Sequence, residues 1–365
     1  MKVALVYDRI NKWGGAERVL LALHELFPNA PLYTSVYNKK KTSWVNNWDI
    51  RTSFLQEFPF AKDAHEFYPL LMPAAFEQFN FDEYDLVISV TSESAKGIIT
   101  KPHTIHICYC LTPTRYLWSG FEEYFDNKII RYLSYPAIWY LRMWDKVSSS
   151  RPDKCIAISH EVKKRIKKYY GQESEIIHPP VDLFATNSQK NVKKKKKYFL
   201  IVSRLVSYKR IDIAIEACNT MRLPLKIVGV GNQLAMLKNM AGPTVDFLGE
   251  VSDEKLKILY QEAEALLFPG YEDFGIVMVE SLGFGTPVIA FNKGGAKDIV
   301  THKKTGILFA SQSASQLISA IKEFRKSSFN SSELKKEARR FSKDVFSKKM
   351  LKTINDTLQN SSKRL

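Results

Sequence analysis

Apolar runs of strand length alternate with stretches of helical periodicity along most of the chain. In the first half, strand-like runs at 2–8, 85–90, 105–110 and 154–159 are separated by segments whose apolar residues recur every three or four positions. After residue 197 the pattern starts again, with strand-like runs at 198–203, 225–229, 245–249, 265–270 and 287–291. Strands that alternate with helices predict parallel sheets built from βαβ units.

The restart of the pattern predicts an α/β protein with two Rossmann-like domains in tandem. A length of 365 residues favours two domains over one. We expect an N-terminal domain over 1–185, a basic linker over 186–197 and a C-terminal domain over 198–344. We expect a cleft between the two domains, because open α/β sheets usually bind their ligands in such a cleft.

The charge of the chain is unusual. Lys and Arg number 54 against 38 Asp and Glu, which gives a net charge of +16 and favours anionic partners without choosing among them. Residues 127–168 contribute eleven Lys and Arg against three Asp and Glu, and they include the aromatic stretch IIRYLSYPAIWYLRMW. This segment predicts either a helix on an anionic membrane surface or a helix packed on the sheet with a solvated basic rim. We expect Pro136 to prevent a single long helix here.

Targeting segments and metal motifs are not found in the sequence. The N-terminus lacks the apolar region of a signal peptide, and no apolar run approaches the ~20 residues that span a bilayer. We therefore expect a cytoplasmic protein, and the basic aromatic segment leaves peripheral binding at the inner face of the plasma membrane open. There is no CxxC pair, zinc-spaced His pair, P-loop or DxD pair, so we expect no metal and no cofactor.

Two glutamates stand out in the stretch PGYEDFGIVMVESLGFGTPVIAFNKGG. Glu272 lies in a loop after a predicted strand, and Glu280 lies inside the helix that begins near Phe274 to Ile276. Eight residues at ~1.5 Å rise would separate them by ~12 Å, whereas glycosidase carboxylate pairs lie about 5–9.5 Å apart. The spacing favours two carboxylates that hold different parts of one elongated ligand, beside N–H groups of the helix start. The alternative is an ordinary exposed helix start with an acidic first turn.

Basic residues and glycines follow other predicted strands. Arg204 and Lys209 in SRLVSYKR could clamp a diphosphate, although basic residues in such loops are often only solvated. Gly14 and Gly15 in WGGAER, at the first strand-to-helix turn, would let a ligand approach the backbone. The stretch GVGNQL has only half of a dinucleotide-binding fingerprint, because the third glycine is missing.

Several stretches together carry a family resemblance. They are WGGAERVLLALHELFPNAPLYTSVY, TSFLQ, YDLVISVTSESAKGI, CYCLTPTRYLW, IHPPVD, VSRLVSYKRID, FLGEVSD and EDFGIVMVESLGFGTPVIAFNKGG. The chain resembles the retaining glycosyltransferases of the two-Rossmann-domain (GT-B) class, family 4, and is similar to the bacterial mannosyltransferase-like branch that builds surface polysaccharides and O-antigens. The resemblance implies the GT-B fold, with a C-terminal helix at about 345–365 that crosses back to the N-terminal domain.

The resemblance also implies roles for particular residues. Arg204 and Lys209 would hold the donor diphosphate, and Glu272 would hold hydroxyls of the transferred sugar. The remaining donor-binding positions would be Glu280 at the ribose, Val251 at the base, the backbone of Phe274, Gly275 and Ile276 at the sugar, and Gly14 and Gly15 at the phosphate and acceptor. The vicinity of the acceptor or sugar would include Leu111, Thr112, Arg115 and Tyr116.

One position departs from the family pattern. Family members usually carry a histidine near the reaction centre where this chain has Leu111, and a leucine side chain can neither donate a hydrogen bond nor move a proton. His106 precedes it by five residues, roughly 16 Å along a strand, so we do not expect it to substitute. Either this subgroup works with leucine, which we favour, or the enzyme has altered donor preference or reduced activity.

The resemblance therefore implies a retaining hexosyltransferase, and the missing DxD pair agrees with a reaction that needs no metal. We expect mannose transfer from GDP-mannose to a glycan or lipid-linked glycan acceptor in cell-surface polysaccharide synthesis. Three alternatives stay open: a UDP-hexose donor, a catalytically weak glycan-binding relative, and a non-enzymatic protein that binds polyanions or nucleic acid. No recognised nucleic-acid-binding motif supports the last of these.

Overall fold

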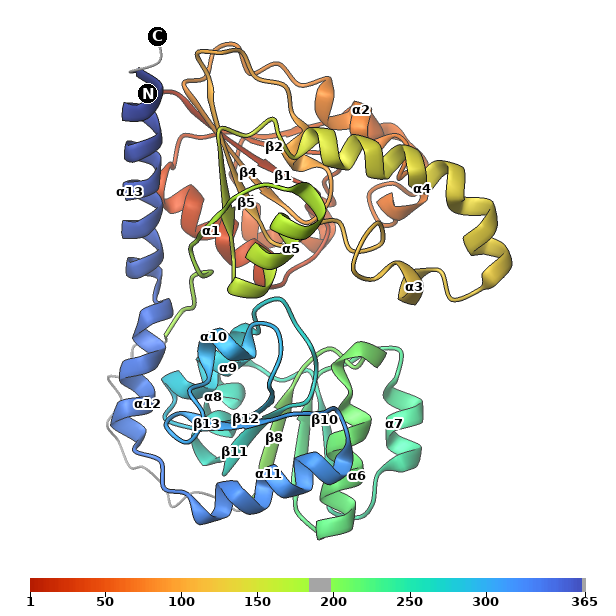
Figure 1. Ribbon diagram of the computed structural model, residues 1–365, viewed down its shortest axis with the longest axis vertical. Helices are drawn as coiled ribbons and strands as arrows, with labels where there is room; N and C mark the ends of the chain where they lie inside the picture. Colours follow the sequence, from red (N-terminus) through yellow and green to blue (C-terminus); the bar gives the residue numbers. More distant parts are fainter. Residues whose placement is uncertain (184–197, 363–365) are drawn as a thin grey trace. The chain divides into compact units, whose positions relative to one another are not determined.

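The computed structural model describes residues 1–183 and 198–362. The chain divides into two compact units, one formed by Met1–Pro180 with Phe346–Leu365 and the other by Val181–Val345 (Figure 1). The expected basic linker at 186–197 lies outside the described residues. Both units are α/β, as the alternating pattern predicts.

The N-terminal unit contains a seven-stranded parallel sheet with strand order β3-β2-β1-β4-β5-β6-β7. Its central strands are buried throughout because nearly all of their side chains are apolar. The strands are β1 (Val3–Tyr7), β2 (Leu32–Thr34), β3 (Ile50–Thr52), β4 (Leu86–Thr91), β5 (Ile105–Cys110), β6 (Lys154–Ala157) and β7 (Glu175–Ile176). The helices are α1 (Gly15–Leu26), α2 (Met72–Glu77), α3 (Phe121–Tyr124), α4 (Lys128–Ser148) and α5 (His160–Tyr170).

The C-terminal helix α13 (Lys343–Ser362) belongs to the N-terminal unit from Phe346 onward. The ring of Phe346 packs edge-on against Tyr109 of β5, with 5.8 Å between centroids. Farther along, the hydroxyl of Thr353 donates to the carboxylate of Glu175 in β7 at 3.3 Å. The expected return of the last helix to the N-terminal domain is therefore confirmed.

The C-terminal unit contains a six-stranded parallel sheet with strand order β10-β9-β8-β11-β12-β13. Its core is formed by apolar side chains of the strands and of α6 and α11. The strands are β8 (Phe199–Val202), β9 (Leu225–Val228), β10 (Val245–Gly249), β11 (Ala265–Phe268), β12 (Val288–Phe291) and β13 (Gly306–Phe309). The helices are α6 (Ile211–Met221), α7 (Leu234–Met240), α8 (Asp253–Glu262), α9 (Ile276–Gly283), α10 (Ala296–Ile299), α11 (Ala314–Lys326) and α12 (Ser331–Ala338).

The expectation that Pro136 prevents a long helix is wrong. Helix α4 runs through Pro136 as a single element of 21 residues. Proline removes one backbone donor, and the carbonyl that loses its partner is that of Tyr132, four residues earlier. Tyr132 is 77% exposed, so water can satisfy this carbonyl, and the buried residues that follow hold the rest of the helix in place.

Each sheet reverses its strand order at one point. In the N-terminal unit the reversal lies between β1 and β4, and in the C-terminal unit it lies between β8 and β11. Loops that leave the carboxyl ends of the two strands at such a point diverge and leave room for a ligand. The loops after β8 and β11 carry the basic and acidic residues that the sequence singled out.

Candidate active site

The loops after β8 and β11 are joined by an ion pair. The ammonium group of Lys209 donates to the carboxylate of Glu272. The two side chains are 12% and 20% exposed, so the pair is shielded yet reachable from solvent. The fold thus brings together two residues 63 positions apart, at the point where the strand order reverses.

Arg204 extends this charged row through Tyr208. The Arg204 guanidinium donates to the Tyr208 hydroxyl at 2.7 Å, and the Lys209 ammonium lies 5.2 Å from the centre of the Tyr208 ring. Arg204 itself is exposed. Two cations are therefore presented from one short turn, which suits a ligand with more than one negative charge.

Two glycines hold the segment that carries Arg204. A Cβ atom on Gly229 would overlap the carbonyl oxygen of Ser203, and one on Gly231 would overlap that of Leu205. Gly229 also has a φ of +126°, which side-chain-bearing residues rarely adopt. The glycines of the GVGNQL stretch therefore serve close backbone packing beneath the basic loop.

The loop that carries Glu272 rests on a second glycine turn. The N–H of Gly295 donates to the carbonyl oxygen of Glu272 at 2.9 Å. At Gly294, φ is +63°, and an added Cβ would overlap that same carbonyl oxygen. The loop also approaches Lys209 closely, because a Cβ on Gly270 would lie 3.1 Å from the Lys209 Cα.

Helix α9 begins directly after this loop. Its N-cap is Gly275, with φ +97° and ψ +66° in the left-handed region. Phe274 is buried and packs edge-on against Phe341, with 5.6 Å between centroids. Because the first N–H groups of a helix lack carbonyl partners within the helix, the start of α9 suits the oxygen atoms of a ligand.

Glu280 lies within α9 and is 4% exposed. One of its carboxylate oxygens accepts a hydrogen bond of 2.9 Å from the hydroxyl of Tyr260 in α8. The Tyr260 ring stacks on Phe284, with 5.5 Å between centroids, so the hydroxyl has a fixed position. Val251 is half-buried on the separate loop between β10 and α8.

In the N-terminal unit, the turn after β1 leads into α1. Gly14 is the N-cap of α1 and Gly15 is its first residue. The backbone of Gly14 is extended, so φ does not require glycine there. An added Cβ would lie 3.2 Å from the carboxylate of the buried Glu17, which accepts a hydrogen bond of 2.7 Å from Tyr7.

The loop after β4 is held by a buried carboxylate. Asp8, at the end of β1, accepts hydrogen bonds from the backbone N–H groups of Ser92, Glu93 and Ala95. Burial raises the pKa of Asp8. Burial also opposes ionisation of Glu93, but Arg9, 2.8 Å away, together with His65 and Lys12 outweighs burial and lowers the pKa of Glu93 to about 2. These hydrogen bonds fix the loop after β4 to the end of β1.

The residues expected near the acceptor follow β5. The N–H of Leu111 donates to the carbonyl of Thr91 at 2.8 Å, and Thr112 accepts from Arg165 at 3.3 Å. Arg115 and Tyr116 come next, both partly buried, and burial raises the pKa of the Tyr116 hydroxyl.

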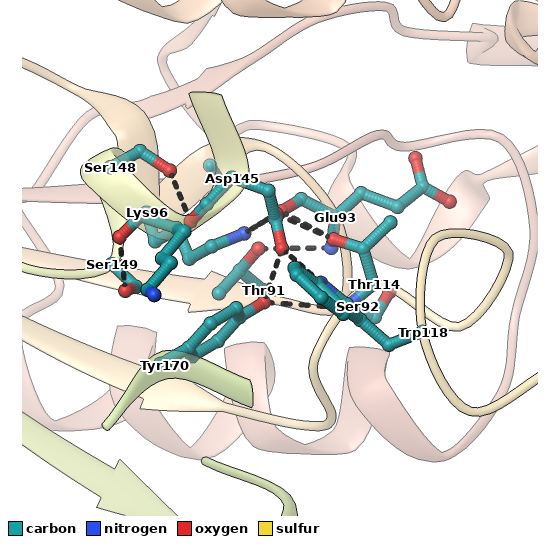
Figure 2. A network of polar contacts seen from close by, with 12 residues as sticks. Thr91, Ser92, Glu93, Lys96, Thr114, Trp118, Asp145, Ser148, Ser149 and Tyr170 are labelled. Carbon is teal, nitrogen blue, oxygen red and sulfur yellow. Dashed lines mark hydrogen bonds and ion pairs between the residues drawn. The ribbon is translucent and has the colours of Figure 1, made fainter. Parts of the chain in front are cut away.

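This segment is fixed by Asp145 of α4, which is 1% exposed (Figure 2). Its carboxylate is ion-paired with Lys96 at 2.5 Å. It also accepts hydrogen bonds of 2.7–2.8 Å from Thr114, Trp118 and Tyr170. Three chain segments, at Lys96, at Thr114 to Trp118 and at Tyr170, thus converge on one carboxylate.

His106 does not replace the missing histidine. It lies inside β5, is fully buried, and its Nε2 is 2.8 Å from the hydroxyl of Ser89. Burial, helped by the positive charge of Arg151, lowers the pKa of His106 to about 3. The ring is therefore neutral at physiological pH, and Leu111 lies at the far end of the strand, as expected.

The structure reveals supporting residues that sequence reasoning missed, chiefly Asp145, Tyr260 and the glycines 294 and 295. The glycine pair had a signal in the sequence, since NKGG follows a strand. Asp145 had a weaker one, because it is the only acidic residue in α4. Within residues 1–183 and 198–362, no group of three or more His, Cys, Asp or Glu side chains is arranged to hold a metal ion.

The C-terminal unit is similar to a known protein family. Residues 184–343 match the family model described as glycosyl transferases group 1. The O-antigen chain mannosyltransferase RfbU of Salmonella typhimurium is 32% identical over 161 residues, which cover 41% of this chain and 45% of that protein. A GDP-mannose-dependent alpha-(1-6)-phosphatidylinositol monomannoside mannosyltransferase of Mycobacterium tuberculosis is 28% identical, covering 46% and 51%. The chain thus spans about half the length of the curated relatives it matches.

Solved structures share the whole fold. HepE of Anabaena, solved with UDP and glucose, has a TM-score of 0.70 at 19% identity and covers 97% of this chain and 99% of its own. Sucrose-phosphate synthase of Thermosynechococcus elongatus has a TM-score of 0.71 at 16% identity, covering 99% and 100%. At these identities the likeness concerns the fold, and it agrees with two Rossmann-like domains of the GT-B type.

Proposed function

We propose that this GT-B glycosyltransferase of the mannosyltransferase-like branch transfers mannose from GDP-mannose to a glycan or lipid-linked glycan acceptor of the cell surface. The observation that carries the proposal is the Lys209–Glu272 pair at the β8/β11 reversal, beside Arg204 and the start of α9. Two cations and a carboxylate in one site suit a ligand that has a diphosphate at one end and hydroxyls at the other.

Each group has a role in this proposal. Arg204 and Lys209 bind the diphosphate and stabilise the negative charge that grows on it as it leaves. Glu272, once the diphosphate attracts Lys209, accepts hydrogen bonds from hydroxyls of the sugar. Glu280, held by Tyr260, accepts hydrogen bonds from the ribose hydroxyls.

The proposed reaction retains the configuration of the anomeric carbon and needs no metal. The acceptor oxygen forms its bond to the anomeric carbon on the face from which the diphosphate departs. The bond between that carbon and the phosphate oxygen breaks, and the acceptor proton passes to the departing phosphate oxygen. Neither Glu272 nor Glu280 acts as a nucleophile in this scheme, because both hold the donor.

The choice of donor rests on relatives. The mycobacterial relative is named as GDP-mannose-dependent, whereas HepE was solved with UDP and with UDP-glucose. A UDP-hexose is therefore the second candidate donor. The base would lie near Val251, whose small apolar side chain fits either base.

Ligand-induced stabilisation tests the proposal. Thermal unfolding of the full chain is measured with GDP-, UDP- and ADP-sugars and with duplex DNA as a polyanion control. We expect GDP-mannose to stabilise most, by about 2.7 kcal/mol at a hundred times its Kd. Transfer to a mannosylated acceptor should then persist in EDTA, and NMR of the product should show the donor's anomeric configuration. Stabilisation by DNA and by no sugar nucleotide would overturn the proposal.

A further inference from the structure

Helix α4 carries a continuous apolar stripe that faces solvent. Eight large apolar side chains of α4 are at least half exposed, and six of them lie along one side of the helix, with Pro136 between Leu133 and Trp139. These six are Ile129, Tyr132, Leu133, Trp139, Met143 and Val147, with exposed fractions between 50% and 77%. The helix runs along the outside of the N-terminal unit (Figure 1). A soluble surface rarely leaves so many large apolar side chains in one row without a partner.

The stripe cannot turn inward, because the opposite face of α4 is fixed. Ile138 and Leu141 are buried there, and Asp145 lies among its four partners (Figure 2). Rotation of the helix would take Asp145 away from the buried ammonium of Lys96. An unpaired buried charge is strongly destabilising, so the stripe stays at the surface.

Exposed basic side chains lie near both ends of the stripe. Lys128 and Lys146 are exposed near the two ends of the helix, and its single acidic residue, Asp145, is buried and neutralised by Lys96. Residues 127–168 contain eleven basic and three acidic residues. A surface that is apolar along its middle and cationic at its edges is complementary to a layer of anionic headgroups over acyl chains.

The aromatic content points to the same occupant. Tyrosine and tryptophan favour the headgroup region of a bilayer, since each has an apolar ring and a polar atom that stays hydrated. Tyr132 and Trp139 occupy such positions on the stripe, and lysine stems can extend from the apolar layer to the phosphates. Among the described residues, no helix is long and apolar enough to cross a bilayer, so α4 would lie in the surface.

We infer that α4 binds the surface of an anionic lipid bilayer, with its stripe toward the acyl chains and Lys128 and Lys146 toward the headgroups. This inference goes beyond the proposed function, because lipid binding by α4 requires neither donor nor acceptor.

Vesicle flotation of the full chain tests the inference. The vesicles contain either phosphatidylcholine alone or phosphatidylcholine mixed with phosphatidylglycerol. We expect binding to the mixed vesicles that is at least about tenfold tighter than to the neutral ones and that weakens with salt. The double variant Leu133→Ser with Trp139→Ser should lose at least about tenfold in affinity for the mixed vesicles.

A matched variant controls for general loss of apolar surface. Met236→Ser with Ile258→Ser removes two side chains that are 45% and 53% exposed in the C-terminal unit, and binding should be unchanged. All variants should keep the wild-type circular dichroism and the wild-type affinity for GDP-mannose. Failure of the inference is thereby separated from failure of the proposed function.

Three results would overturn the inference. The first is the absence of binding to the mixed vesicles. The second is equal binding by the wild type and the Leu133→Ser, Trp139→Ser variant. The third is a wild-type dimer in solution that this variant converts to a monomer, because the stripe would then be an interface between two copies of the chain.

Discussion

Lys209 and Glu272 form an ion pair between the loops that follow β8 and β11. Without a ligand, the charges of the two side chains neutralise each other. The cation and the anion are then both available to a ligand that separates them. A diphosphate competes with Glu272 for the ammonium group, and the carboxylate then becomes available to sugar hydroxyls. Because Lys209 must change its partner before Glu272 can bind the sugar, the roles of the two residues depend on each other.

Replacement of Lys209 should therefore reduce catalysis more than stability. We expect Lys209→Ala to lower kcat/KM by about 10²–10³-fold, since a preorganised charge at the leaving group is lost. Lys209→Arg should retain part of the activity, because charge is kept while geometry changes. The measurement is steady-state kinetics with GDP-mannose. Lys238→Ala, an exposed lysine on α7, is the control, and an equal effect of the two alanine variants would contradict the assigned role.

The glycine turn under Glu272 provides a second prediction. Gly294→Ala should destabilise the C-terminal unit, because φ is +63° and the new methyl group overlaps the Glu272 carbonyl oxygen. The left-handed backbone alone costs about 1–2 kcal/mol, and the overlap adds to it by displacing the loop. We expect activity to fall together with the thermal midpoint.

Gly249 is a matched control for that variant. Its φ is +64°, nearly the same, but an added Cβ there has no neighbour within 4 Å. Gly249→Ala should therefore show only the backbone cost and should leave kcat close to the wild-type value. If both alanine variants lose the same stability and the same activity, close packing under Glu272 is not what requires Gly294.

The sequence predicted the loops of this site but not their contacts. Strand ends, glycines and charged residues are local signals, so Arg204, Glu272 and the start of α9 were identifiable from the pattern. The neighbour relation of Lys209 and Glu272 depends on β8 lying beside β11, and no local pattern encodes that strand order.

Tertiary contacts explain the other differences. In the sequence, Asp145 is one acidic residue within a basic stretch. Its burial depends on four partners that are distant in sequence, which are Lys96, Thr114, Trp118 and Tyr170. Pro136 read as a helix breaker, because the sequence could not show that the carbonyl it leaves without a partner would be exposed to water.

Tyr260 should act on the donor through Glu280. The Tyr260 hydroxyl donates to the Glu280 carboxylate at 2.9 Å, so Tyr260→Phe removes one hydrogen bond and keeps the ring on Phe284. We expect donor affinity to fall about three- to tenfold, in line with a loss of about 0.5–1.5 kcal/mol. Glu280→Ala should reduce it further, because the proposed contact with the ribose is lost.

Calorimetry of GDP and GDP-mannose binding checks this pair. Both ligands contain the ribose, so both should lose affinity by the same factor in each variant. A selective loss for GDP-mannose would instead assign Glu280 to the sugar, and unchanged affinity in Glu280→Ala would contradict any contact with the donor.

His106 should make the protein sensitive to acid. Its pKa is about 3 in the folded state because of burial and of the nearby Arg151, against 6.5 as the ordinary value. A group with a lowered folded pKa binds its proton preferentially in the unfolded chain as pH falls below 6.5, so the free energy of unfolding falls between pH 6.5 and 3 and is unaffected above it. At about pH 5 this lowers the free energy of unfolding by about 2 kcal/mol, at about 1.4 kcal/mol per unit of pH.

Urea unfolding at about pH 7.5 and about pH 5 measures this loss. The difference between the two free energies of unfolding should be smaller by that amount in His106→Gln, which can still bond to Ser89. His103→Gln, at an exposed histidine, should keep the wild-type difference. An unchanged pH dependence in His106→Gln would mean that other groups cause the loss of stability in acid.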